Sequence, residues 1–172
     1  MLPFLAQVLP VLVFLLAIAL VSEVCDRCGL FDVVGRGLLV AARGRAWLLW
    51  LGLAIGCLAI TAVLSLDTTA VLMAPVAISM AKRAGRDPFP FAVTCVWLAN
   101  TGSLLLPVSN LTNLLSTGSD SPLAGSFASH TWPVAATASV VTLVVIVAFW
   151  PGLLRGRYRI PAPASAPDSL LV

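Results

Sequence analysis

Five long runs of the sequence contain no lysine, arginine, aspartate or glutamate, and this spacing of charge strongly limits the possible folds. The runs cover residues 1–22, 46–66, 68–81, 88–119 and 121–154. A charge-poor stretch of about 20 apolar residues is long enough to cross a bilayer as a helix. Charged residues make up 10% of the chain, whereas soluble domains carry about 25%. The pattern therefore predicts an all-α integral membrane protein and excludes a soluble domain, a disordered chain and a nucleic-acid binder.

The ten basic residues fall into three groups, which predict how the chain crosses the membrane. The groups run from Arg27 to Arg45, from Lys82 to Arg86 and from Arg155 to Arg159. Under the positive-inside rule all three groups are cytoplasmic. We therefore expect a multi-pass protein of the bacterial inner membrane with its N-terminus outside and its C-terminus in the cytoplasm.

This arrangement divides a single membrane domain, residues 1–160, into five segments. We expect spans at 4–22 and 131–150, a discontinuous span at 88–116, a re-entrant hairpin at 46–81 and an interfacial helix at 29–45. The interfacial helix is predicted because Asp32, Arg36 and Arg43 share one helical face while Leu30, Val34 and Leu38 form an apolar stripe. An ordinary polar loop is the alternative. The Pro- and Ala-rich tail, 161–172, is predicted to be disordered.

An acidic residue lies in the middle of the predicted hairpin, within Ser65-Leu66-Asp67-Thr68-Thr69. A carboxylate at membrane depth costs about 2.5–3.5 kcal/mol on insertion scales, so Asp67 is a candidate functional residue and proton carrier. In the alternative interpretation, 46–65 and 68–81 both cross the membrane and Asp67 lies in a solvated turn outside. The second arm has few charge-free residues and contains the helix breaker Pro75, which favours the re-entrant hairpin.

A second polar segment interrupts the predicted span 88–116. Between Ala99 and Asn113, Gly102 and Pro107 weaken a helix locally. Irregular backbone at membrane depth is tolerated only where it is buried in protein or lines a cavity, and such broken helices bind ions or small solutes. The alternative is an intact helix whose small polar residues contact neighbouring helices. The polar side chains of this segment include Asn100, Thr101, Ser103, Ser109, Asn110, Thr112 and Asn113.

The cysteines give no metal or cofactor site in this interpretation. Cys25 and Cys28 form a C-x-x-C pair without a second pair or a neighbouring histidine, so a zinc site is not predicted. Cys57 and Cys95 are single residues inside apolar runs. No nucleophile–base pair, phosphate-binding loop or second intramembrane acid is present, so we expect no enzyme activity.

Two stretches of the sequence resemble a known family of transporters. The run SLDTTAVLMAPVAISMA from Ser65 and the run WLANTGSLLLPVSNLTNLL from Trp97 are similar to the ion transporter superfamily. The resemblance is strongest to the arsenical pump membrane protein and its anion-permease and sodium/proton-antiporter relatives, and covers roughly residues 4–160. It implies two inverted-topology halves, each with one re-entrant hairpin and one broken helix whose tips meet within the membrane.

The resemblance also implies a function and a set of binding residues. We expect proton-coupled export of arsenite or a related small anion or neutral solute, with sodium/proton antiport as the alternative. The residues that match the family's binding segments are Asp67, Thr68, Thr69, Asn100, Thr101, Ser103, Ser109, Asn110 and Asn113. An aspartate stands at position 67 where dicarboxylate-transporting relatives have a neutral asparagine, which favours protons over sodium as the coupling ion.

The chain matches only the N-terminal half of this family pattern, because it has one hairpin and one broken helix. A site made from two halves is then incomplete in one copy. We therefore expect one of three arrangements. The chain is half of a split transporter whose site is completed by a partner half-transporter chain, or two copies complete the site as a homodimer. In the third arrangement the chain is truncated and transports nothing alone. An antiparallel dimer is disfavoured because the basic groups fix one orientation.

Overall fold

The computed structural model of the chain describes residues 2–110, 112–113 and 126–159. Throughout these residues the regular elements are helical, which confirms the predicted all-α class. The α-helices are α1 (Leu2–Arg27), α2 (Leu30–Ala41), α3 (Ala46–Val63), α4 (Leu66–Arg83), α5 (Pro88–Gly102) and α7 (Phe127–Phe149). Two short 3₁₀ helices, η1 (Pro107–Ser109) and η2 (Pro151–Leu154), follow α5 and α7.

Two of the described helices, α3 and α7, are long and apolar enough to cross a membrane by length and composition. Helix α1 contains the predicted span 4–22, and α7 begins four residues before the predicted span 131–150. The discontinuity predicted in 88–116 is present, because α5 ends at Gly102 and the chain continues irregularly to η1. The far end of that span and the predicted tail 161–172 lie outside the described residues.

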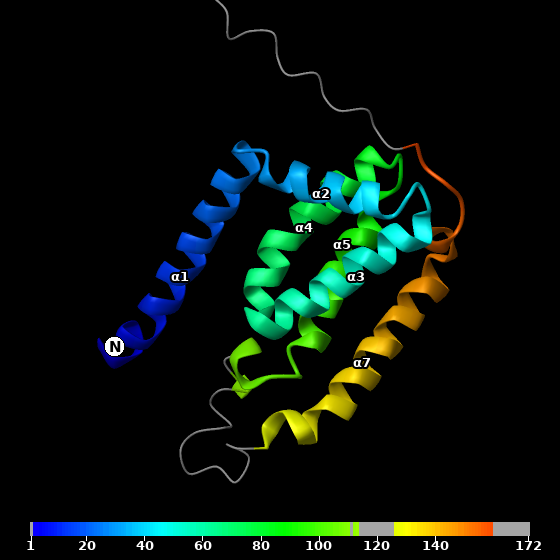
Figure 1. Cartoon of the computed structure of the whole chain (residues 1–172). Coiled ribbons are helices and arrows are strands. Elements are labelled where there is room, and N and C mark those ends of the chain that lie inside the picture. The colour runs from blue at the N-terminus through cyan, green and yellow to red at the C-terminus, as the bar shows by residue number, and fades with distance from the viewer. Residues whose placement is uncertain (1, 111, 114–125, 160–172) are drawn as a thin grey trace, which may run out of the picture.

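The helices form a bundle that is covered at one end. Helices α3, α4, α5 and α7 make up the bundle, α2 lies across its end, and α1 stands at one side (Figure 1). The most extensive helix contact is between α4 and α5, and α3 and α7 also pack on α5. Leu53, Met80, Phe91, Leu98 and Ile146 are among the buried side chains that join these helices. Helix α5, which leads into the irregular segment, is therefore the central element.

The predicted hairpin consists of α3 and α4, which are joined by a two-residue turn. Pro75 was expected to interrupt the second arm, but α4 continues through it. A proline has no N–H to donate to the carbonyl four residues earlier, which here is the carbonyl of Val71. The Ser22 hydroxyl of α1 donates to that oxygen at 3.4 Å. A neighbouring helix thus supplies the missing donor, which is how membrane helices tolerate proline.

Helix α2 packs on the bundle through a face that the sequence pattern did not single out. Its buried residues are Phe31, Gly35 and Leu39, whereas Leu30 and Val34 of the expected apolar stripe remain exposed. A Cβ at position 35 would lie 3.5 Å from Cβ of Met80, so the small residue lets α2 approach α4 closely. The interfacial position of α2 remains a prediction.

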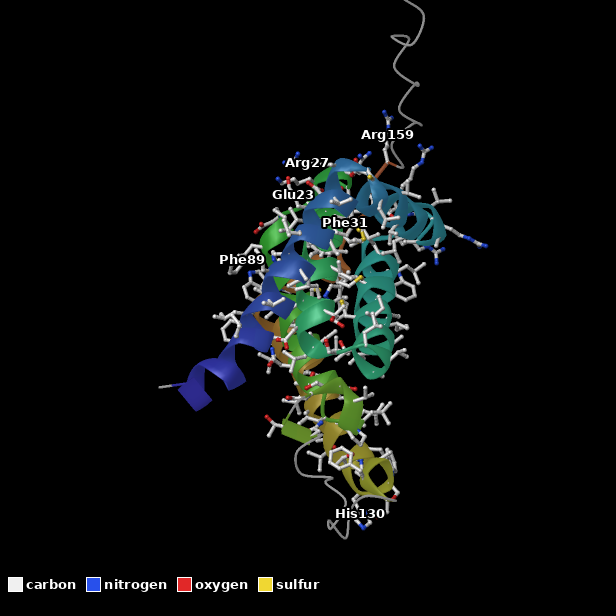
Figure 2. The ribbon with its side chains drawn as sticks, turned by 90° about the vertical axis from the view of Figure 1, so that its left-hand side faces the viewer. Glu23, Arg27, Phe31, Phe89, His130 and Arg159 are labelled. Carbon is white, nitrogen blue, oxygen red and sulfur yellow. The ribbon has the colours of Figure 1, made fainter. Side chains whose placement is uncertain are left out.

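All ten basic residues lie toward one end of the bundle, which we call the basic end. They occupy the last turns of α1 and α4, helix α2, the turn before α3, the turn between α4 and α5, and the segment after η2. Figure 2 shows Arg27 and Arg159 at this end and His130 at the opposite end. The grouping required by the positive-inside rule is therefore present, while the side of the membrane that it faces remains a prediction.

Candidate functional site

The turn of the hairpin is fixed by hydrogen bonds at the start of α4. Ser65 caps this helix by accepting a bond from the backbone N–H of Thr68 at 3.1 Å, and its hydroxyl donates to Oγ1 of Thr68 at 2.8 Å. Thr69 is buried and donates to the carbonyl of Ser65 at 2.8 Å. The bond to Ser65 satisfies one of the backbone N–H groups that a helix N-terminus leaves free, and the two hydroxyl bonds fasten the turn to α4. The two threonines of the predicted site therefore shape the turn.

Asp67 lies in the first turn of α4, with its side chain exposed on the surface of the chain. The positive end of the helix dipole favours a negative charge in this position. No hydrogen bond or ion pair reaches its carboxylate from the described residues. Of the described acidic residues, the other four lie in α1, α2 or the turn before α5 at the basic end. Asp67 is thus separated from the basic residues and exposed at the start of α4.

Side-chain bonds to backbone carbonyls fix the conformation of the irregular segment after α5. The Asn113 amide donates from Nδ2 to the carbonyl of Ser103 at 2.7 Å and to that of Leu106 at 3.2 Å. Ser103 is buried and donates to the carbonyl of Asn100 at 2.8 Å. Asn110 accepts from the N–H of Thr112 at 3.0 Å. Asn113 and Ser103, two of the predicted binding residues, therefore bond to backbone carbonyls of their own segment.

One hydrogen bond joins this irregular segment to the hairpin. Ser109 is buried, and its hydroxyl donates to the carbonyl of Ala62 in the last turn of α3 at 3.0 Å. Gly102 also approaches α3, because a Cβ there would lie 3.0 Å from Cδ2 of Leu58 and 3.6 Å from Cβ of Thr61. The C-terminal ends of α3 and α5 therefore meet beside the N-terminus of α4. We call the hairpin turn, residues 62–69, together with the described residues of 100–113, the tip region.

The structure brings together some of the predicted site residues and leaves others in ordinary helical roles. Ser109 contacts the hairpin, and Ser103, Asn110 and Asn113 organise the irregular segment. By contrast, Asn100 and Thr101 bond to carbonyls four residues earlier in α5. This is the usual behaviour of polar residues within a membrane helix.

Helix α7 contributes two hydroxyl residues that the sequence analysis missed. Thr131 donates to the carbonyl of Leu105 at 3.2 Å, and Ser139 donates to Oγ1 of Thr101 at 3.4 Å. The available signal was their position as small polar residues inside an apolar span, where such residues bond between helices. The irregular segment is therefore held between α3 on one side and α7 on the other.

Two cysteines that appeared unrelated in the sequence are in contact in the structure. Cys57 of α3 and Cys95 of α5 are both fully buried and unoxidised, and their sulfur atoms lie 3.4 Å apart. Their separation in sequence gives no spacing motif, so only the packing of α3 on α5 reveals the pair. In the part of the chain that the structure describes, no group of three or more metal-ligating side chains is present.

Comparison with known protein families matches nearly the whole chain. A family model described as a citrate transporter covers residues 4–166. The chain belongs to the citrate transporter family. This membership, together with the helices long enough to cross a membrane, relates the chain to membrane transporters rather than to enzymes. It agrees with the family resemblance that the hairpin and broken-helix sequences indicated.

Curated relatives of this citrate transporter family member include arsenical pumps. The arsenical pump membrane protein of Yersinia enterocolitica is 28% identical over 159 residues, which are 91% of this chain and 35% of the relative. The protein of that name in Escherichia coli is 27% identical, with 88% of this chain and 37% of the relative covered. An uncharacterized E. coli transporter, YfbS, is 34% identical over 56% of this chain and 17% of its own length.

The chain spans about a third of the length of the arsenical pumps that it matches. No solved structure gives a significant match to it. The fold described above therefore corresponds to one portion of the longer transporters.

Proposed function

We propose that this chain takes part in the proton-coupled export of arsenite, or of a related small anion or neutral solute, across the bacterial inner membrane. Its membership of a transporter family and its similarity to arsenical pump membrane proteins support this function. The structural observation that carries the proposal is the bond from Ser109 to Ala62, which holds the broken helix against the hairpin. Helix ends gathered in this way are a common basis for solute sites in transporters.

In the proposed mechanism Asp67 alternately holds a solute and a proton. Its ionised carboxylate accepts hydrogen bonds from the hydroxyl groups of a neutral polyhydroxy solute such as arsenite. Thr68 and Asn110 supply further polar groups from the two sides of the tip region. Protonation of Asp67 removes an acceptor and replaces it with a donor, which weakens solute binding. Solute leaving in one direction is therefore exchanged for a proton entering in the other.

This mechanism places the tip region within the membrane. In both views the hairpin turns back before it reaches the level at which α7 begins, and Figure 2 marks that end of α7 by His130 (Figures 1 and 2). A hairpin shorter than the neighbouring span supports the re-entrant interpretation over two complete crossings. With the basic end in the cytoplasm, the hairpin enters from that side and the N-terminus lies outside.

The solute site is completed by a second set of helices in this proposal. The tip region supplies one hairpin and one irregular segment, and the relatives are almost three times as long as the matched portion. A partner half-transporter chain, or a second copy of this chain, would supply the opposing hairpin. Sodium in place of protons remains the alternative coupling ion.

The family's description favours citrate as a second candidate solute. Hydroxyl and amide donors such as those of Thr68 and Asn110 are suited to a carboxylate. A citrate anion would be repelled by ionised Asp67 and accepted once this residue is protonated. Citrate and protons would then move in the same direction, whereas arsenite and protons would move in opposite directions.

Flux into proteoliposomes can test both candidates. The full chain is reconstituted with a pH gradient of either sign, and uptake of arsenite and of citrate is measured separately, with and without sodium. We expect arsenite transport to depend on the gradient and Asp67→Asn to abolish that dependence, because asparagine does not titrate. Asp26→Asn is the matched control, since it removes an exposed carboxylate at the basic end.

The outcomes separate the possibilities. Equal gradient-dependent flux in the wild type and Asp67→Asn would remove Asp67 from the mechanism. Citrate flux that follows protons in the same direction would favour the second candidate, and dependence on sodium alone would exclude proton coupling. Absence of flux for every solute would contradict transport by this chain alone.

A further inference from the structure

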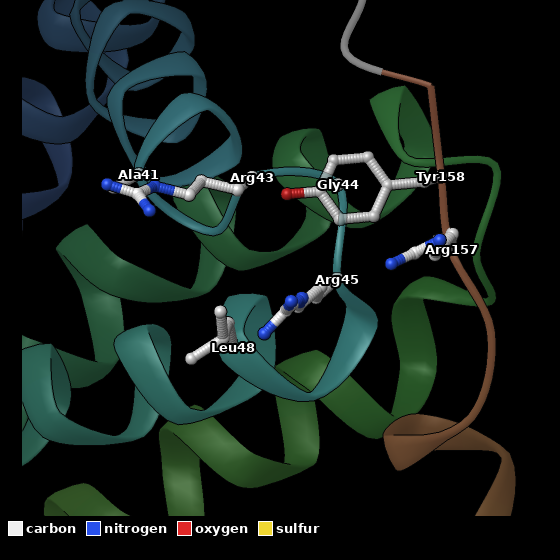
Figure 3. Close-up of a pocket in the computed structure, with 7 residues that line it drawn as sticks. All are labelled: Ala41, Arg43, Gly44, Arg45, Leu48, Arg157 and Tyr158. Atoms are coloured by element: carbon white, nitrogen blue, oxygen red, sulfur yellow. The ribbon is translucent and has the colours of Figure 1, made fainter.

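A pocket lined by three arginines lies at the basic end, away from the tip region. It has a volume of about 560 Å³ and is lined by Ala41, Arg43, Gly44, Arg45, Leu48, Arg157 and Tyr158. In Figure 3 the side chain of Arg157 is directed toward Arg45, Arg45 extends over Leu48, and Arg43 extends along α2 past Ala41. Arg45 and Arg157 therefore form a pair over an apolar floor, with Arg43 at the rim.

The pocket is assembled from two parts of the chain that are fastened together through their backbones. The segment after η2 returns to the turn between α2 and α3, where the N–H of Tyr158 donates to the carbonyl of Gly44 at 2.9 Å. The N–H of Ala46 donates to the carbonyl of Gly156 at 3.3 Å, and an isolated antiparallel bridge pairs Arg45 with Arg157. These bonds fix the two arginines side by side before any ligand binds.

The buried side chain of Tyr158 strengthens this attachment. Its hydroxyl donates to the carbonyl of Leu39 in α2 at 2.7 Å. Burial raises the pKa of Tyr158, so the phenol remains a neutral donor across the physiological range. The segment that carries Arg157 is thus held against α2 as well as against the turn.

Positive charge in the pocket is not balanced by the described acidic residues. Asp32 pairs with Arg83, and Glu23 pairs with Arg27. No ion pair with a described acidic residue reaches the three pocket arginines. Cations held close together repel one another, and an anion bound between them removes that cost. The lining is therefore suited to an anionic group.

The backbone at the rim of the pocket is unusual for its sequence. Arg43 has a φ of 50°, and among the described residues no other non-glycine has a positive φ. A non-glycine residue in this left-handed region costs free energy, and such strain is frequently retained at binding sites. The strained turn carries Arg43 and leads directly into Arg45, so the same conformation places both guanidinium groups around the pocket.

The surroundings of the pocket indicate the source of the anion. Helix α3, one of the two candidate spans, begins at Ala46 directly after Arg45, and Trp47 is exposed beside it. The other candidate span, α7, leads through η2 to Arg157. The ends of spans lie at the level of lipid headgroups, where tryptophan is enriched. Leu48 provides an apolar contact for the part of a lipid next to its headgroup.

We propose that Arg45 and Arg157, with Arg43 at the rim, bind the phosphate of an anionic phospholipid headgroup. Guanidinium groups match phosphate oxygens in a two-point geometry, and basic pockets at the ends of membrane helices are suited to such headgroups. The bound lipid bridges the start of α3 and the segment after α7. It thereby stabilises the basic end without contacting the tip region.

Native mass spectrometry of the full chain in neutral detergent tests this site. Phosphatidylglycerol and phosphatidylcholine with identical acyl chains are titrated separately, and inorganic phosphate is added as a competitor in a third arm. We expect the wild type to retain phosphatidylglycerol in preference to phosphatidylcholine. Arg45→Gln/Arg157→Gln should weaken phosphatidylglycerol binding roughly 30-fold, from about 1 kcal/mol for each lost charge.

Two further double variants separate the pocket from the general charge of the basic end. Arg36→Gln/Lys82→Gln removes the same charge from residues that do not line the pocket, and we expect near-wild-type binding. Arg45→Lys/Arg157→Lys keeps the charge but loses the planar guanidinium, so an intermediate affinity is expected. Single Arg45→Gln and Arg157→Gln variants, each checked by circular dichroism, replace the double variant if it does not fold.

Three outcomes would overturn the proposal. The first is equal affinity of Arg45→Gln/Arg157→Gln and the wild type for phosphatidylglycerol. The second is an equal loss in Arg36→Gln/Lys82→Gln, which would show a general charge effect. The third is displacement of phosphatidylglycerol by millimolar inorganic phosphate together with no preference over phosphatidylcholine, which would assign the pocket to free phosphate.

Discussion

Several helices end at the basic end and several end in the tip region. The hydrogen bonds of the two regions differ in how often they join elements that are far apart in the sequence. At the basic end the bonds join elements far apart in the sequence, as between Tyr158 and Leu39 or between Arg86 and the carbonyls of Gly152 and Arg155. In the tip region most polar side chains bond within their own segment. Among the described residues, Ser109 bonds from the irregular segment to the hairpin, and Thr131 and Ser139 bond to this region from α7.

This difference bears on which parts of the molecule can move relative to one another. A network of bonds between elements resists relative movement of the helices that it joins. Segments with internally satisfied bonds can move against one another with little loss, because only the joining contacts must break. The basic end is thus suited to serve as a fixed base, and the hairpin and the broken helix are suited to rock against each other.

The largest expected effect comes from Gly44, which has a φ of 74° and would place a Cβ 2.9 Å from the backbone oxygen of Tyr158. Gly44→Val should lower the free energy of unfolding by roughly 2–5 kcal/mol through backbone strain and overpacking. Gly37→Ala is the control, since nothing lies within 4 Å of its Cβ position in α2 and alanine favours a helix. Thermal unfolding in detergent measures both, and equal stability of the two variants would contradict a rigid basic end.

A smaller loss is expected where α5 meets α3. Gly102→Val places a side chain against Leu58 and Thr61, and overpacking of this kind costs about 1–3 kcal/mol. Because the contact joins the broken helix to the hairpin, the variant should also change the reactivity of the Cys57–Cys95 pair toward a membrane-permeant thiol reagent. Unchanged stability and unchanged labelling would show that the two segments already separate freely.

Removing single hydroxyl groups compares the two regions directly. Ser109→Ala and Tyr158→Phe each delete a bond between elements, and each should cost about 1 kcal/mol. Hydrogen exchange should rise in residues 60–70 for the first variant and in residues 39–46 for the second. Ser129→Ala, which removes an exposed hydroxyl of α7 that bonds locally, should change neither. An effect of Ser109→Ala that spreads to the basic end would contradict independent movement.

The smallest effect concerns pH. A hydrogen bond from Ser79 and the guanidinium of Arg83 lower the pKa of Asp32 below its usual value of 3.8. A lowered folded-state pKa means that stability from Asp32 is complete above the unfolded-state pKa and is lost as pH falls through the folded-state value. Since the pair is largely exposed, the loss should stay below about 1 kcal/mol. The thermal midpoint of the wild type should fall more between pH 6 and about pH 3 than that of Asp32→Asn.

Much of this organisation could be predicted from the order of residues, and the unpredicted part has a common cause. The charge-free runs, the single basic end and the helix break between Gly102 and Pro107 all depend on local composition, so the sequence revealed them. The packing face of α2, the Cys57–Cys95 contact and the return of Tyr158 to α2 depend on which elements become neighbours. Spans that are apolar on all sides carry no period that identifies an inner face.

The residues of the candidate site could likewise be predicted from the sequence only in part. The sequence identified Asp67 and the polar residues after Gly102 because such residues are costly at membrane depth. It could not separate Ser109, which reaches the hairpin, from Asn100, which bonds within α5, since both are polar residues in one stretch. The contributions of Thr131 and Ser139 required the position of α7.

The hydroxyl of Ser22 donates to the carbonyl of Val71, which Pro75 leaves without a donor. The effect of a substitution at position 22 therefore depends on the residue at position 75. Loss of the serine leaves an oxygen without its donor only while the proline is present. A chain with alanine at position 75 supplies its own N–H and no longer needs the serine. Related sequences with proline at this position should accordingly also have the serine, and a lineage that acquires the proline should already carry the serine.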